Sequence, residues 1–132
     1  MRLRERKKRM SKFLNQLLRP EIPSVAEQQP TAEYEVKRLS RLAGEPVTVT
    51  LRALPYGKTQ ELREMERDVE IHILLAGCRE LADSALQAKF GGATPVETVK
   101  AMFLPGEIAD LSRAVERLSG YRRDTIREVK NA

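Results

Sequence analysis

The sequence contains little of what enzymes and metalloproteins commonly use. It has one cysteine, Cys78, one histidine, His72, and no tryptophan in 132 residues. A single cysteine excludes a disulfide within the chain and a zinc site built from clustered cysteines, and a single histidine excludes a metal site with several histidines. No apolar run approaches the roughly 20 residues that span a bilayer. The basic start of the chain is not followed by the apolar stretch of a secretory signal.

The few residues that could carry chemistry are better explained as structural. His72 and Cys78 lie six positions apart in DVEIHILLAGCREL, a spacing that does not place them on one face of a helix. We interpret His72 as a structural or solvent-facing histidine and Cys78 as a small buried apolar residue. Gly91 and Gly92 are interpreted as a helix stop, because no GxxxxGK[ST] follows them. The sequence therefore predicts no catalytic residue, no cofactor, no metal and no enzyme.

Basic residues are concentrated at the start of the chain. Residues 1–9 hold six basic residues and one acidic residue, whereas residues 10–132 hold eighteen of each sign. We expect 1–9 to be a flexible basic arm. Its composition also suits an over-extended start, with Met10 as the native initiator, because a purine-rich ribosome-binding sequence read in frame encodes Arg, Lys and Glu. The alternative function is a small nucleic-acid- or anion-binding adaptor that uses this arm, although the arm has no aromatic residue for base stacking.

Residues 10–32 are predicted to form a short amphipathic helix and a proline-rich linker. Ser11 is a candidate N-cap, Pro20 ends the helix, and PEIPSVAEQQP contains three prolines in eleven residues. The helix either docks on the domain and completes its core or binds a partner. The candidate partner-binding residues share one helical face: Phe13, Leu14, Leu17 and Leu18.

Residues 33–121 are predicted to form an α+β domain that begins with a β-hairpin. The segment VTVTLRAL, residues 47–54, alternates apolar and polar side chains as a half-buried strand does. EYEVKRL, residues 33–39, alternates less regularly, and SRLAGEP between the two segments is expected to be a loop. Because an isolated hairpin is marginally stable in water, we expect four or five short C-terminal helices to pack against it.

Helical periodicity follows Pro55. LREME is expected to form a short helix with Leu62 and Met65 turned inward, and a longer buried helix is expected to open at Asp68. The inward face of the longer helix would contain Ile71, Leu74, Leu75 and Cys78.

Two further helix starts are predicted from capping patterns. Ser84 with Gln87 resembles a capping box, and so does Thr94 with Pro95 at N1 and Glu97 at N3. The second of these helices is expected to turn its last apolar residues toward the core.

The stretch LPGE is predicted to be a corner between two helices. Leu104 precedes a proline and is biased away from the helical region, and Pro105 can open the next helix. Glu107 would then lie near the positive end of that helix dipole, and Gly120 would end the helix. We expect the tail, residues 122–132, to add a frayed helical turn or two. The apolar stripe of the helix after LPGE would be Ile108, Leu111, Val115 and Leu118.

The ordered set of these segments, over roughly residues 10–130, resembles the XkdN-like family of bacteriophage tail assembly chaperones. The resemblance is carried by GEPVTVTLRAL, by DSALQAKFGG and by FLPGEIADLSRAVERLSGY. The basic residues 1–9 are not part of the family pattern. The motif residues are Arg52, Ala53, Leu54, Leu86, Gln87, Phe90, Gly91, Leu104, Pro105, Gly106, Glu107, Leu118, Ser119, Gly120 and Tyr121.

The resemblance implies a non-enzymatic role in phage or prophage tail assembly. A member of this family would bind the tape measure protein, assist assembly of the tail tube, work in the cytoplasm of the bacterial host and be absent from the mature virion. A contact with the tail tube protein and self-association are both compatible with that role. The residues themselves give no sign of a membrane partner, and nucleic acid is not expected as a ligand because the rest of the chain offers no basic recognition helix.

Overall fold

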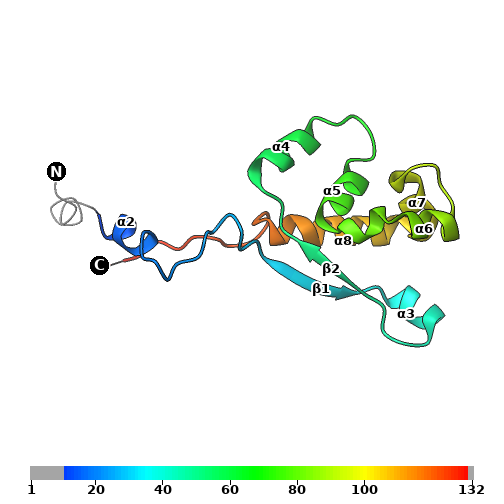
Figure 1. The fold of residues 1–132 in the computed structure, drawn as a ribbon, viewed down its shortest axis with the longest axis horizontal. Helices are drawn as coiled ribbons and strands as arrows, with labels where there is room; N and C mark the ends of the chain where they lie inside the picture. Colours follow the sequence, from blue (N-terminus) through cyan, green and yellow to red (C-terminus); the bar gives the residue numbers. More distant parts are fainter. Residues whose placement is uncertain (1–10, 131–132) are drawn as a thin grey trace.

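The computed structural model describes residues 11–130 and shows a two-stranded hairpin packed against helices (Figure 1). Five α-helices and one 3-10 helix follow the hairpin in this part of the chain. The predicted class, α+β and mostly helical, is confirmed. The elements in chain order are α2 (Lys12–Leu17), β1 (Thr31–Glu35), α3 (Lys37–Ala43), β2 (Thr48–Arg52), α4 (Tyr56–Arg63), α5 (Val69–Gly77), η1 (Arg79–Ala82), α6 (Ser84–Phe90), α7 (Pro95–Met102) and α8 (Pro105–Leu118).

The hairpin is antiparallel and buries one face. Its register pairs Thr31 with Arg52 at one end and Glu35 with Thr48 at the other. The alternation predicted for VTVTLRAL is present, because Leu51 is fully buried and the neighbouring Arg52 is exposed. The buried face is covered by α5 and α8, which both contact β2. The hairpin therefore gains the apolar cover that two strands need for stability.

The connection inside the hairpin is a helix, which corrects the sequence prediction. Residues 37–39 were expected to be the end of a strand and 40–46 a loop, but α3 spans Lys37–Ala43. Its residues, KRLSRLA, are mostly good helix formers. Gly44 ends α3 in the left-handed region with φ 76°, where a residue without Cβ pays no steric cost. Leu39 packs against the core from this helix, so tertiary contact supports a segment that is too short to be helical alone.

The core lies between α5, α8 and β2. The helix α5 packs along α8, and the predicted inward residues Ile71, Leu74 and Cys78 are buried. Leu62 of α4 is also buried, and Met65 is half-buried just after that helix. The central cluster of buried residues is Val36, Leu51, Ile71, Leu74, Cys78, Leu81, Val99, Phe103, Ile108, Leu111, Ala114 and Val115.

One of the two predicted capping boxes is displaced by a residue. Asp83, not Ser84, is the N-cap of α6, and its carboxylate accepts a hydrogen bond from the N–H of Ala85 at 2.8 Å. An aspartate competes well for an N-cap because its charge also suits the helix dipole. The prediction for α7 is confirmed: Thr94 accepts from the N–H of Glu97 at 3.3 Å, with Pro95 at the first position.

The end of the chain also differs from the prediction. The residues from 121 to 130 form no helix, so the expected frayed turn is wrong. Gly120 follows α8 with φ 98° and Arg122 has φ 60°, both in the left-handed region that interrupts a helix. Ile126 and Val129 are exposed, so this segment has no buried apolar face to support a helix. The basic arm and the candidate start Met10 lie outside the described residues.

Candidate partner-binding surface

The helix α2 begins as predicted at Ser11. The Ser11 hydroxyl oxygen accepts a hydrogen bond from the N–H of Leu14 at 3.2 Å. The helix ends at Leu17, before Pro20. A thirteen-residue linker, residues 18–30, then leads to β1 without a helix or strand. All linker residues are exposed except Gln29, which is half-buried.

The apolar face of α2 faces solvent. Phe13 is 65% exposed, Leu18 63%, and Leu14 and Leu17 are both above 40%. The helix has no buried residue, and none of its side chains belongs to the central cluster. Figure 1 shows α2 at the end of the linker, away from the helices that pack against the hairpin. Of the two alternatives for this helix, completion of the core is therefore not the arrangement that the structure has.

The LPGE corner holds three elements together through one carboxylate. Glu107 accepts the N–H of Leu104 at 2.7 Å, which caps the start of α8. The same carboxylate makes a two-point contact with the Arg38 guanidinium of α3, at 2.8 Å and 3.0 Å. Arg38 also donates to the carbonyl of Met102 at the end of α7, at 2.8 Å. The corner is therefore a structural joint that fixes α3, α7 and α8 together.

The charge state of this joint depends on the same contacts. The hydrogen bonds from Arg38 hold the pKa of Glu107 below its ordinary value, and the N–H of Leu104 acts in the same direction. Partial burial opposes this shift. The Glu107 side chain is 17% exposed and that of Arg38 is 30% exposed, so solvent screens the pair only in part. Arg38 was not among the predicted residues, and no local pattern marks a pair separated by 69 positions.

We expect Glu107→Ala to lower the free energy of unfolding by about 1 kcal/mol, because the N–H of Leu104 loses its capping acceptor. Glu107→Gln keeps an acceptor and removes only the charge. A depressed pKa means that the charge stabilises the folded state above the unfolded pKa of about 4.3 and loses this effect as pH falls through the lower folded value. Urea unfolding at pH 7, 5, 4 and 3 should therefore show wild type and Glu107→Gln converging at low pH. A difference that stays constant across that range would contradict this account.

The other motif residues are divided between core contacts and exposed positions. The hydroxyl of Ser119 accepts the N–H of Leu54 at 2.9 Å and donates to the carbonyl of Val115 at 2.8 Å. The hydrogen bond from Leu54 joins the segment after β2 to the end of α8. Tyr121 is half-buried, and the Arg63 guanidinium of α4 lies 4.7 Å from its ring centroid. Exposed members include Arg52, Phe90, Leu104, Pro105 and Gly106.

The described residues offer little for chemistry. Between Ser11 and Lys130, no three His, Cys, Asp or Glu side chains are arranged to hold a metal ion. Cys78 is buried, and this burial raises the pKa of its thiol, which keeps the thiol protonated and poorly nucleophilic. His72 lies half-buried on α5. No helix in this part of the chain is long and apolar enough to cross a membrane.

The comparisons with known proteins agree with the resemblance found in the sequence. No curated protein and no solved structure is significantly similar to this chain. A family model described as the phage XkdN-like tail assembly chaperone protein matches residues 66–132. The match includes α5 to α8 and the LPGE corner, whereas the motif residues Arg52, Ala53 and Leu54 precede it. Because the match spans half of the sequence, the chain belongs to the family of phage XkdN-like tail assembly chaperones.

Proposed function

We propose that this tail assembly chaperone binds the tape measure protein through the apolar face of α2. The observation that carries the proposal is the exposure of all four apolar side chains of that face, on a helix held away from the core by a linker. Exposed apolar faces of this kind are typical of surfaces that bind proteins. Membership of a chaperone family points to a non-enzymatic role, which agrees with a surface built from alkyl and aromatic groups.

The proposed mechanism is shielding. A tape measure protein is a long helical chain, and before the tail tube surrounds it, its apolar stripes would be exposed to water and prone to aggregate. An amphipathic helix such as α2 can cover such a stripe by helix-to-helix packing. Burying one leucine or phenylalanine contributes about 1.5–3 kcal/mol, so four such residues together can hold the tape measure protein. Tube subunits that bind the same apolar stripe would then displace the chaperone. The chaperone would act in the cytoplasm of the bacterial host and would not remain in the virion.

The test is co-expression with the tape measure protein encoded nearby, followed by size-exclusion chromatography with light scattering. We expect a soluble complex with wild type and insoluble tape measure protein with a variant whose four apolar residues, Phe13, Leu14, Leu17 and Leu18, are replaced by serine. The matched control is Lys12→Ser with Gln16→Ser, which changes the same helix on its polar positions. Equal complex formation by all three proteins would refute a role for the apolar face.

A second deletion separates this proposal from the adaptor function. Removing residues 1–9 takes away the basic arm and leaves α2 and the domain intact. The chaperone proposal predicts unchanged binding of the tape measure protein. Loss of binding on this deletion, with binding retained by the α2 serine variant, would favour the adaptor instead.

A further inference from the structure

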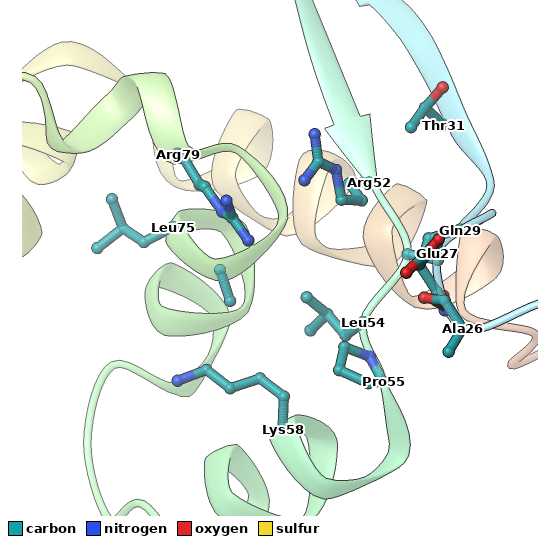
Figure 2. Close-up of a pocket in the computed structure, with 12 residues that line it drawn as sticks. Ala26, Glu27, Gln29, Thr31, Arg52, Leu54, Pro55, Lys58, Leu75 and Arg79 are labelled. Carbon is teal, nitrogen blue, oxygen red and sulfur yellow. Dashed lines mark hydrogen bonds between the residues drawn. The ribbon is translucent and has the colours of Figure 1, made fainter. Parts of the chain in front are cut away.

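A cationic groove lies on the domain, on a surface different from that of α2. It has a volume of about 830 Å³ and is bordered by the end of β2, by α4, by α5 with η1, and by the linker before β1 (Figure 2). Its apolar lining residues include Leu54, Pro55 and Ala76. Three basic side chains from three different elements line it: Arg52, Lys58 and Arg79. The groove therefore combines apolar lining residues with three cations, which we call its positive rim.

The charges on this rim are largely uncompensated. Within residues 11–130 the side chains of Arg52 and Arg79 make no hydrogen bond or ion pair, and both are exposed. Lys58 has only a surface contact with Glu61 at 3.7 Å. One acidic residue, Glu27, lies on the linker side of the groove. Acidic and basic residues are equal in number over the described residues. The three cations that line the groove against one carboxylate are therefore a local feature and do not reflect the charge of the whole domain.

The backbone at the groove is already hydrogen-bonded. The N–H of Ala53 donates to the carbonyl of Pro30 at 2.9 Å, that of Leu54 donates to Ser119, and Pro55 has no N–H. An added strand needs free N–H groups for its ladder, so this edge does not offer a place for one. A helix satisfies its own backbone and needs only side-chain contacts. The groove is consequently suited to a helix.

We propose that the groove binds an acidic amphipathic helix of a partner protein. Apolar side chains of that helix would contact Leu54 and Pro55, and its carboxylates would pair with Arg52, Lys58 and Arg79. Glu27 sets the orientation, since the carboxylates would lie on the side away from the linker. The proposal rests on the proposed function only in taking the client to be a protein, and it places the contact at a second site.

The charge pattern also argues against α2 as the occupant of the groove. The segment that contains α2, residues 11–19, carries Lys12 and Arg19 and no acidic residue. It would place positive charge against a positive rim, so α2 does not complement the groove. Nucleic acid is disfavoured by the lack of an aromatic ring among the lining residues, because bases bind single-strand sites largely by stacking.

The test uses a labelled helical peptide of about 20 residues with a leucine stripe flanked by glutamates. Its binding to the full chain is measured by fluorescence anisotropy at low and high salt. We expect Arg52→Glu with Arg79→Glu to weaken binding at least about tenfold, and high salt to weaken wild-type binding. The matched control is Lys37→Glu with Lys89→Glu, which makes the same change of charge at exposed positions outside the groove and should bind as wild type does.

A charge-swapped peptide, with lysines in place of the glutamates, keeps the test decisive. It should bind the Arg52→Glu, Arg79→Glu variant more tightly than wild type, which a misfolded variant could not achieve. The proposal is overturned if the acidic peptide does not bind wild type, or if it binds the groove variant equally well. It is also overturned if a single-stranded oligonucleotide binds in place of the peptide and loses affinity in the groove variant. None of these variants alters α2, so failure here is distinct from failure of the α2 proposal.

Discussion

Leu51→Ala is expected to lower the free energy of unfolding by about 2–5 kcal/mol. Leu51 is fully buried in β2, between the two elements that cover the hairpin, α5 and α8. Its truncation removes buried methyl groups and leaves a cavity that the packed helices α5 and α8 cannot fill by moving. Because small domains are marginally stable, this change alone removes much of the stability of the fold.

The measurement is urea unfolding followed by circular dichroism at pH 7. The matched control is Leu42→Ala, which makes the same truncation on α3 at a side chain that is 74% exposed. The control should change the free energy of unfolding by less than about 0.5 kcal/mol. Similar effects from both substitutions would mean that the hairpin does not contribute to the core in the way described.

Gly77→Ala is expected to destabilise the protein although alanine favours helices. In a solvent-facing helix, this change would add about 0.5–1 kcal/mol of stability. At residue 77, a Cβ would lie 2.6 Å and 2.8 Å from the two methyl groups of Val115, and 3.2 Å from the carbonyl oxygen of Arg52. Val115 is fully buried and β-branched, so its methyl groups cannot rotate away. Overpacking of this kind costs about 1–3 kcal/mol, which exceeds the gain in helix propensity.

A double-mutant cycle tests this cause directly. Val115→Ala removes the two methyl groups that would collide with the new Cβ, so Gly77→Ala should be much less harmful in that background, with a coupling of about 1 kcal/mol or more. Gly57→Ala is the matched control, because it is also a helical glycine and nothing lies within 4 Å of its added Cβ. We expect the control to be neutral or stabilising. Additive effects of Gly77→Ala and Val115→Ala would show that the collision with Val115 is not the reason why alanine is harmful at residue 77.

Local patterns predicted much of this fold. Alternation in residues 47–54 gave the buried side of β2, and Thr94 with Pro95 gave the start of α7. The proline of LPGE identified the joint between α7 and α8. These features depend on neighbours in the sequence, through side-chain period, capping and the fixed φ of proline.

The misplaced features depend on contacts that a local pattern does not contain. The helix α3 was expected as a strand end and a loop, although its helix-forming residues and Gly44 were signals that could have indicated it. Arg38 meets Glu107 across 69 positions, which no periodicity reveals. The same holds for the groove, where three cations from separate elements become neighbours only on folding. The helix α2 was located from sequence, but its exposure required the structure.

The linker between α2 and β1 limits how far apart the two proposed contacts, at α2 and at the groove, can lie on a client. Residues 18–30 contain three prolines and so form a semi-rigid spacer, which reaches up to roughly 40 Å when extended at about 3.1 Å per residue. Once the groove holds one segment of a client, α2 would meet a second segment at a local concentration set by that reach. The two contacts together would give a longer residence time than either alone, and a growing tube that displaced one would leave the chaperone held by the other alone. The spacing of client segments along the tape measure protein would therefore set where a chaperone settles and how quickly it leaves.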